Sequence, residues 1–452
     1  MSSVLIRALA IISFLTVTAV IICLEYHQYN LSFRLVNAYT PVLRFSQDNA
    51  VAQVKDPQLK VQVIANGLSL PTSMAFLGPN DILVLEKDKG TVIRIVDGKM
   101  NQQPLLDVNV ATQIERCMCG IAADVSDLNV TYVFLYFTEA YGSDGGPPIY
   151  NRLYKYELAN NNTKLTNPVL LLNLPAVPGP RHNGGAIIIG PDNNVYVPIG
   201  DVDGHKSQSE NFKNGPPVDG SGGILRITQS GQAVPNSPLG DTYPLNLYYA
   251  YGIRNSFGID FDPITGKLWD TENGPGYGDE INLVEPGFNS GWSRIEGPTV
   301  RNNYENNSNN YRAEDSLPGA QKPDIITYPS NLVDFAGKGV YAPPQFTWNH
   351  TVGPTGIKFF DSNKYGIEYQ DDLFVGDVHN GNLYRFKLNT DRTQLALTGT
   401  LKDKIANNPD ELQQVVFGTG FGGITDLEVG PDGYLYIVSL GQGKIYRIVP
   451  ER

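Results

Sequence analysis

The fold class follows from GPDGYLYIVSLGQGKIYRI, residues 430–448. A Gly-Pro-Asp-Gly turn precedes a short apolar run, and a second glycine-containing turn leads to another run that ends in basic and apolar residues. Turn residues that tolerate positive φ, placed between short runs rich in Tyr, Val and Ile, are typical of antiparallel strands. The stretch therefore predicts two paired β-strands.

The same sequence phrase, a turn, a short apolar run, a second turn and another run, recurs along the chain. Strands of this kind cannot bury both faces alone, whereas radial stacking of such units buries them. Apart from the N-terminal segment, no window has a sustained 3.6-residue apolar period, which argues against an α/β fold. The sequence predicts an all-β protein, a six-bladed β-propeller over residues 61–452. The six repeats begin at Gly78, Asp127, Gly190, Asp262, Tyr369 and Gly430.

An apolar segment precedes the repeats. Residues 8–24 contain no charge, and Arg7 lies just before them. As a helix this stretch is about 26 Å long, near the short limit for a membrane span. We expect residues 1–24 to be a transmembrane signal anchor, with a cleaved signal peptide as the alternative, and residues 25–60 to be a spacer. The positive-inside rule then places the propeller on the extracytoplasmic side of the cell membrane, anchored by a single pass, or in secreted form if the signal is cleaved.

The overall charge bears on the partners. The chain has 452 residues and a formal net charge of −12. Nucleic-acid binders need a clustered basic face, and the sequence has no run of Lys or Arg, so no nucleic-acid partner is expected. Asn-x-Ser/Thr triplets are compatible with an exported glycoprotein, although an asparagine-rich chain also forms them by chance. They begin at Asn30, Asn129, Asn161, Asn306 and Asn349.

Three cysteines are too few for a disulfide framework. Cys23 lies in the apolar N-terminal segment, and Cys117 and Cys119 lie in ERCMCG. The Cys-x-Cys pair is compatible with a small disulfide ring, a soft-metal site or two packed thiols. A separate polar, asparagine-rich stretch at residues 293–352 predicts a long loop insertion on one face of the propeller, where function usually concentrates.

His182 is the first candidate for chemistry. It lies in RHNGG, residues 181–185, just before a predicted strand. In a propeller such a position faces the mouth of the central channel. Gly184 and Gly185 carry no Cβ and would allow a flat ligand to approach. A neutral imidazole suits a general base, and the alternative is a histidine hydrogen-bonded into a blade junction.

Two further clusters carry polar groups. Arg254 and Asn255 lie in a glycine-flanked turn, where a guanidinium can polarise a developing oxyanion; the alternative is an ordinary salt bridge. The loop with Gly274, Pro275, Asp279 and Glu280 offers carboxylates and backbone carbonyls, the oxygen ligands that Ca²⁺ prefers; the alternative is an ordinary acidic turn.

Together these motifs resemble the soluble glucose/aldose sugar dehydrogenases and sorbosone dehydrogenases, six-bladed propellers that use pyrroloquinoline quinone (PQQ) and Ca²⁺. The resemblance runs from about Val61 to Val449. It is carried by the RHNGG stretch, by YGIRNSFGIDFDPITGKLW, by ENGPGYGDEINLVEPGFNSGW and by GPDGYLYIV.

The resemblance implies roles for individual residues. His182 matches the base that removes the proton of the sugar hydroxyl while hydride moves to the quinone. Arg254 matches a contact to the quinone oxygen, and Asn255 matches a second cofactor contact. The backbone at Gly274 and Pro275 matches the cation site.

The chain also departs from the family pattern. Gly423 and Thr425 stand where the family has an arginine pair, and His379 stands where it has a lysine. Each charged hydrogen bond lost to a tricarboxylate costs about 1.5–3 kcal/mol. We therefore expect a weaker hold on PQQ, with His379 and Thr425 as the contacts at these positions and Lys358 and Arg294 as compensating cations.

Three functions are compatible with this pattern. The first is an extracytoplasmic quinoprotein oxidoreductase that oxidises an aldose or similar hydroxyl substrate and passes electrons to an external acceptor. It is favoured by His182, Arg254 and Asn255. The second is a membrane-anchored binding propeller that has lost the cofactor, favoured by Gly423 and Thr425. The third is a calcium-dependent propeller lactonase, which would direct several Asp, Glu and Asn side chains at one ion.

Overall fold

Each repeat supplies the two middle strands of one sheet. The computed structural model describes residues 51–451, except 128, 160–162 and 301–330. In the last repeat, β30 (Leu435–Ser439) pairs antiparallel with β31 (Lys444–Pro450). The repeat that begins at Gly190 likewise forms β13 (Asn194–Ile199) and β14 (Gly223–Thr228). The repeated phrase is therefore a structural unit.

In the two repeats that begin with Gly-Pro-Asp, the aspartate of the turn binds the tyrosine of the following strand. Asp432 accepts a hydrogen bond from the Tyr436 hydroxyl at 2.9 Å, and Asp192 accepts one from the Tyr196 hydroxyl at 3.0 Å. The glycine that precedes the turn leaves room for this ring, because a Cβ at Gly430 would lie 2.5 Å from Tyr436. Turn and strand thus fix each other through side chains.

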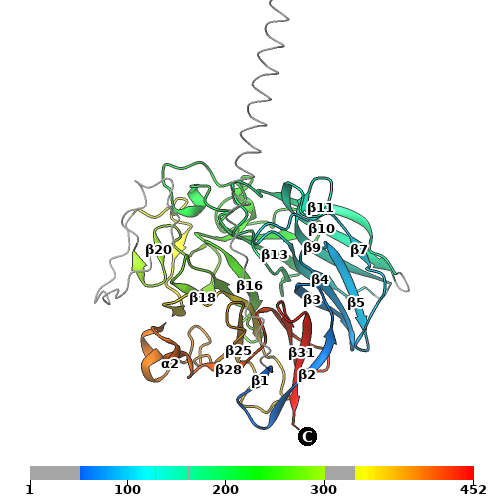
Figure 1. Ribbon diagram of the computed structural model, residues 1–452. Coiled ribbons are helices and arrows are strands. Elements are labelled where there is room, and N and C mark those ends of the chain that lie inside the picture. Colours follow the sequence, from blue (N-terminus) through cyan, green and yellow to red (C-terminus); the bar gives the residue numbers. More distant parts are fainter. Residues whose placement is uncertain (1–50, 128, 160–162, 301–330, 452) are drawn as a thin grey trace, which may run out of the picture. The chain divides into compact units, whose positions relative to one another are not determined.

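Within the described residues the strands form six sheets of four or more strands, the blades, arranged as Figure 1 shows. In the first three blades the order from the innermost strand outward is β3 (Pro71–Gly78), β4 (Asp81–Glu86), β5 (Thr91–Val96) and β6 (Lys99–Met100), with β7 (Leu106–Asp107) also on β5; then β8 (Met118–Asp124), β9 (Val130–Ala140), β10 (Pro148–Ala159) and β11 (Thr166–Leu174); then β12 (Ile188–Ile189), β13, β14, β15 (Tyr248–Tyr251), β19 (Phe288–Asn289) and β22 (Val340–Tyr341).

The remaining three blades follow the same plan. They consist of β16 (Ser256–Phe261), β17 (Leu268–Glu272), β18 (Asp279–Val284), β23 (Phe346–Trp348) and β27 (Ile405–Ala406); then β24 (Pro354–Phe359), β25 (Leu373–Asp377), β26 (Leu383–Phe386), β28 (Val416–Thr419) and β1 (Gln53–Val54); then β29 (Ile424–Val429), β30, β31 and β2 (Leu59–Asn66).

The blades close into a ring. Strand β3 contacts β8, β8 contacts β12, β13 of the third blade contacts β16, β16 contacts β24, and β24 contacts β29. The ring is closed by β29 of the last blade, which contacts β3 of the first. The last blade is completed by β2, which pairs antiparallel with β31. The all-β propeller expected from the sequence is confirmed. A cavity on the propeller axis is lined by residues from every blade, among them Ser73, Ile121, Ile188, Ile259, Lys358 and Glu428.

Short strands and helices lie in the segments that connect the longer strands. The described part of the stretch predicted as a loop insertion supplies β22 and β23 to two blades, and β1 and the start of β2 lie in the predicted spacer. The other short elements are a two-stranded sheet of β20 (Ile295–Glu296) and β21 (Thr299–Val300), the 3₁₀ helices η1 (Gln208–Glu210), η2 (Leu245–Leu247) and η3 (Gly399–Asp403), and the helix α2 (Pro409–Leu412).

The predicted signal anchor lies outside the described residues, as do the sequons at Asn30, Asn161 and Asn306. Among residues that the structure does describe, no helix has the length and apolar character needed to cross a membrane. The two sequons inside the described part differ in exposure, since Asn129 is exposed and Asn349 is half-buried.

Candidate active site

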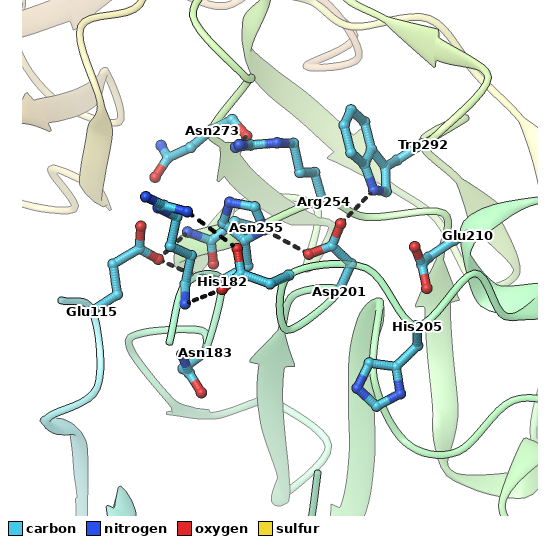
Figure 2. A network of polar contacts seen from close by, with 12 residues as sticks. Glu115, His182, Asn183, Asp201, His205, Glu210, Arg254, Asn255, Asn273 and Trp292 are labelled. Carbon is cyan, nitrogen blue, oxygen red and sulfur yellow. Dashed lines mark hydrogen bonds and ion pairs between the residues drawn. The ribbon is translucent and has the colours of Figure 1, made fainter. Parts of the chain in front are cut away.

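His182 and Asp201 form a buried pair in the third blade. The His182 Nδ1 atom lies 2.5 Å from Asp201 Oδ1, and their side chains are 3% and 0% exposed. An ionised carboxylate can only accept a hydrogen bond, so Nδ1 carries the proton and Nε2 of the neutral ring stays basic. The pair has the geometry of a general base oriented by a carboxylate, as Figure 2 shows.

The backbone at His182 needs support from its surroundings. Its φ of 60° lies in the left-handed region, which costs a β-carbon-bearing residue about 1 kcal/mol or more. The following glycines pack against neighbouring strands, since a Cβ at Gly184 would lie 2.2 Å from the Pro198 carbonyl oxygen. A Cβ at Gly185 would likewise lie 2.4 Å from a backbone carbonyl oxygen. The glycines therefore serve close packing of the loop that carries His182.

Asp201 is anchored from two sides. Its Oδ2 atom accepts a hydrogen bond from Trp292 Nε1 at 2.8 Å, and its amide donates to the Arg254 carbonyl at 2.9 Å. Burial alone would raise the pKa of Asp201, but the interaction with His182, the Arg254 charge and the Trp292 hydrogen bond together lower it. Asp201 therefore stays ionised and keeps the histidine in one orientation.

Arg254 lies just before β16 and reaches across to the next loop. Its Nη1 atom donates to the carbonyl oxygens of Asn273 at 2.6 Å and Gly274 at 3.0 Å. The guanidinium carbon lies 5.3 Å from the centre of the Trp292 ring. Arg254 forms no salt bridge within the described part of the chain, so the salt-bridge alternative does not explain it.

Two polar atoms of this cluster lack partners. Arg254 Nε and Asn255 Oδ1 are buried and make no hydrogen bond within the described residues. The Asn255 amide nitrogen is engaged, since it donates to Glu115 Oε2 at 3.3 Å. Buried polar groups without partners are rare in native proteins and call for a ligand or water. A donor and an acceptor are thus available beside His182.

Glu115 connects this cluster to the second blade. Its Oε2 atom also accepts a hydrogen bond from the His182 amide at 2.5 Å. Two residues later, Cys117 and Cys119 form a disulfide and are 3% and 1% exposed. Of the three interpretations of the Cys-x-Cys pair, the structure selects the disulfide ring.

The residues predicted to bind a cation divide into different roles. Asp279 Oδ1 accepts from the Gly274 amide at 2.8 Å, and Oδ2 accepts from the Val352 and Gly353 amides at 2.7 and 2.9 Å. Asp279 therefore closes the loop that contains Gly274 and Pro275. The backbone carbonyls of these two residues are the oxygen atoms of the loop that a cation could share.

Glu280, the neighbouring residue in β18, points to the other side of the strand and binds other groups. Its Oε1 atom accepts from the Gly297 amide at 2.6 Å and its Oε2 atom from Asn282 Nδ2 at 3.1 Å. Across the described ranges, no three His, Cys, Asp or Glu side chains gather as a metal site. A calcium ion at Gly274 and Pro275 stays a prediction.

Three residues stand where the resembled family has basic side chains, and in this chain they make contacts that hold the fold together. Thr425 is buried and its hydroxyl donates to the Pro71 carbonyl at 3.0 Å, which ties the last blade to the first. Gly423 has a φ of 85°, and a Cβ there would lie 2.9 Å from the Val378 carbonyl oxygen, so an arginine would be strained. His379, the residue after Val378, donates a hydrogen bond from its backbone amide to the Val352 carbonyl at 3.3 Å.

The two cations expected to compensate lie in other environments. Lys358 Nζ is 3.2 Å from Asp260 Oδ1 and 2.9 Å from Glu428 Oε2, so carboxylates on the inner strands neutralise it. The Arg294 guanidinium carbon lies 5.5 Å from the centre of the Phe212 ring. Neither Thr425 nor Lys358 therefore joins the contacts around His182.

A buried acidic cluster lies behind Arg254. Glu272 Oε1 accepts a hydrogen bond from the Arg254 amide at 2.6 Å. Burial, followed by the charge of Glu280, raises the pKa of Glu272 to about 8, and burial raises the pKa of Glu280 to about 7. Burial and the charge of Glu272 hold the pKa of Asp270 well above its usual value.

Replacing Asp270 by asparagine is expected to stabilise the protein at pH 8. Carboxyls with a raised pKa bind protons more tightly in the folded than in the unfolded state, so stability falls as pH rises above about 4 and through the pKa of the folded protein. A tenfold difference in proton affinity between the two states is worth about 1.4 kcal/mol, and asparagine removes the titrating group. We expect a gain of about 1 kcal/mol or more at pH 8 and a smaller one at pH 5, measured by calorimetry.

The exposed Asp241→Asn variant, which changes the net charge equally, is the matched control and should leave the unfolding temperature unchanged. An unfolding temperature of Asp270→Asn that is lower than wild type at pH 8 would show that the carboxylate is needed in its ionised form.

Sequence reasoning missed three contacts of the site. Asp201 follows the strand that comes after the RHNGG stretch, Glu115 lies beside the cysteines, and Trp292 ends the loop motif. A polar residue directly after a blade strand was the available signal for Asp201. The structure brings His182, Arg254 and Asn255 together as expected.

The amino-acid sequence is similar to those of known sugar dehydrogenases. The family described as "Glucose / Sorbosone dehydrogenase" matches residues 68–342 and 327–447. An aldose sugar dehydrogenase of Escherichia coli is 23% identical over 87% of this chain and 93% of its own. Quinoprotein glucose dehydrogenase B of Acinetobacter calcoaceticus is 23% identical over 75% of this chain and 79% of its own.

A solved structure agrees with the fold. The PQQ-bound aldose sugar dehydrogenase from Streptomyces coelicolor has a TM-score of 0.61 at 22% identity, covering 88% of this chain and 99% of that one. The family match spans most of the described propeller, including His182, Arg254 and the loop at Gly274. The chain belongs to the glucose/sorbosone dehydrogenase family.

Proposed function

We propose that this protein is a PQQ-dependent dehydrogenase that oxidises a hydroxyl group of an aldose or a similar substrate. The observation that carries the proposal is the His182–Asp201 pair, set beside the unpartnered Arg254 Nε and Asn255 Oδ1 atoms. His182 Nε2 takes the proton of the substrate hydroxyl, and Asp201 stabilises the imidazolium that forms. Arg254 supplies positive charge where an oxygen becomes negative.

The residues present fit one end of PQQ better than the other. When bound, PQQ accepts the hydride that leaves the substrate carbon. Arg254 and Asn255 offer a donor and an acceptor for its quinone end, and the unpartnered atoms support this assignment. The Gly274 and Pro275 carbonyls would hold the Ca²⁺ that accompanies the cofactor, for which Arg254 must release Gly274. At the carboxylate end, Gly423 and Thr425 carry no charge, so the hold is weaker.

The location belongs to the same proposal. The buried Cys117–Cys119 disulfide supports an oxidising compartment, because disulfides persist mainly outside the cytosol. We propose that the propeller lies on the extracytoplasmic side of the cell membrane, held by the N-terminal segment, and carries glycans. An external acceptor then removes the electrons from the reduced cofactor.

Titration of the full-length protein with PQQ and Ca²⁺, in mild detergent, tests the proposal. Bound-cofactor absorbance should saturate, and dye reduction should follow with aldoses. Arg254→Ala is expected to weaken PQQ binding about 10–100-fold, the effect of one charged hydrogen bond. Arg94→Ala is the charge-matched control, since Arg94 pairs with Asp81 at 2.7 Å in the first blade.

Absence of saturable binding at micromolar PQQ would favour the second candidate, a binding propeller, which Gly423 and Thr425 support. The lactonase alternative needs several carboxylate and amide side chains on one ion, and no structural observation from the described residues favours it. Hydrolysis of a lactone that depends on Ca²⁺ and not on PQQ would reverse this order.

A further inference from the structure

A short loop, residues 175–181, leads directly into His182. Four of its carbonyl groups are bound by side chains from other segments. Asn151 Nδ2 donates to the Pro175 carbonyl at 2.7 Å. Arg116 donates to two of them, at 2.6 and 3.1 Å. His205 binds the fourth, the carbonyl of Val177, at 2.5 Å. The left-handed backbone of His182 thus follows a loop that Arg116 and His205 restrain.

His205 is engaged at both ring nitrogens. Its Nε2 atom faces the Val177 carbonyl, and its Nδ1 atom lies 2.5 Å from Asp219 Oδ2. A carbonyl and an ionised carboxylate can only accept hydrogen bonds, so both ring nitrogens must carry hydrogen. Asp219 is itself fixed, because its Oδ1 atom accepts from the Ser221 amide at 3.0 Å and hydroxyl at 2.6 Å. In this arrangement His205 is an imidazolium.

We propose that His205 is a positioning residue for His182. Its charged ring joins the loop at residues 175–181 to Asp219 and so holds His182 in the conformation that pairs it with Asp201. Its role in turnover rests on the function proposed above, whereas its role in loop order does not.

The charged groups around His205 show which one matters. Asp219 lies on one side of the ring, and the buried Glu210 faces it from η1. Burial and the charge of Asp201 raise the pKa of Glu210 to about 8, so Glu210 is mostly neutral at pH 7. Asp219 is therefore the main counter-charge. On the other side of the loop, Arg181 lies 3.6 Å from Asp203.

The contact has a defined pH dependence. Burial would lower the pKa of His205, but the hydrogen bond and charge of Asp219 and the hydrogen bond to the Val177 carbonyl outweigh burial and raise it. A raised histidine pKa gives a contact that is complete below about pH 6.5 and is lost as pH rises through the pKa of the folded protein. The loop should loosen over that range.

Hydrogen exchange of the full-length protein tests the proposal without reference to activity. The amides of Gly179, Arg181 and His182 should be protected at pH 6, relative to amides of β25, and this relative protection should fall as pH rises. In His205→Gln, which has no charge, protection at pH 6 should be about tenfold lower and should not change with pH. NMR titration of the His205 ring in the wild type should give the same midpoint.

Two variants complete the test. The exposed His350→Gln is the matched control and should behave as wild type in exchange. Asp219→Asn should shift the midpoint to lower pH, because it removes the counter-charge. Equal protection in wild type and His205→Gln, or a His205 ring that titrates without a change in the loop amides, would overturn the proposal.

Turnover provides the second arm. At pH 6.5 we expect His205→Gln to lower kcat about tenfold with little change in KM, and the deficit should shrink as pH rises and the wild type loses its own contact. A deficit that is independent of pH would contradict the positioning role. If no sugar is oxidised by wild type, the proposed function fails while the exchange experiment still decides whether His205 orders the loop.

Discussion

Replacing His182 by alanine is expected to lower kcat for aldose oxidation by about 10²–10⁴-fold, the contribution of a positioned general base. Alanine removes His182 Nε2, the only nitrogen of the His182–Asp201 pair that can take the substrate proton. The affinity for PQQ should change little, because His182 has no part in the proposed quinone contacts. Steady-state dye reduction and equilibrium cofactor titration measure the two quantities separately.

The control, His350→Ala, removes an exposed histidine from another loop and should retain wild-type turnover. Both variants lose one imidazole, so a difference between them reports the position of the histidine in the site. A His182→Ala protein that keeps more than about a tenth of the wild-type kcat would assign the base to another group.

The exchange Asp201→Asn should lower kcat by a similar factor through the tautomer of His182. Trp292 Nε1 donates to this side chain at 2.8 Å, so the asparagine oxygen must face the indole and its NH₂ group must face His182. The imidazole Nδ1 then accepts a hydrogen bond, and Nε2 carries the proton. A ring in that form cannot act as a base at Nε2.

The double variant Asp201→Asn/Trp292→Phe is the diagnostic control. Without the indole donor, the asparagine amide is free to turn its oxygen towards Nδ1, and part of the activity should return. Recovery of turnover in the double variant over the single one, measured as kcat, supports the tautomer mechanism. Equal losses in both would attribute the effect to the missing charge alone.

The propeller was predictable because its local units are regular. The phrase at Gly430 and the one at Gly190 each contain a turn, an aspartate and a tyrosine that bind one another, so the two middle strands of a blade leave a local signature. The outer strands leave none. β23 and β27 are three and two residues long and come from distant parts of the chain to complete the blade of β18, which is why the sequence predicts a loop at residues 346–348.

The site was predictable only where a polar side chain lies beside glycines in a loop of the sequence. His182 and Arg254 stand out because glycines flank them. Glu115 lies 67 residues from His182, and Trp292 lies 91 residues from Asp201, so their hydrogen bonds exist only once the blades have closed. Residue spacing also does not report oxidation, which left the state of Cys117 and Cys119 open until the structure joined them.

The closing of the ring by β2 has a mechanical consequence. Leu59 pairs with Pro450 and Asn66 with Lys444, so the start of β2 and the end of β31 lie at the same edge of the last blade (Figure 1). Before β2, the chain passes through β1, which adds only two residue pairs to the neighbouring blade. A force that pulls the start of β2 away from the end of β31 would therefore break the hydrogen bonds between these strands one at a time, instead of loading all of them together.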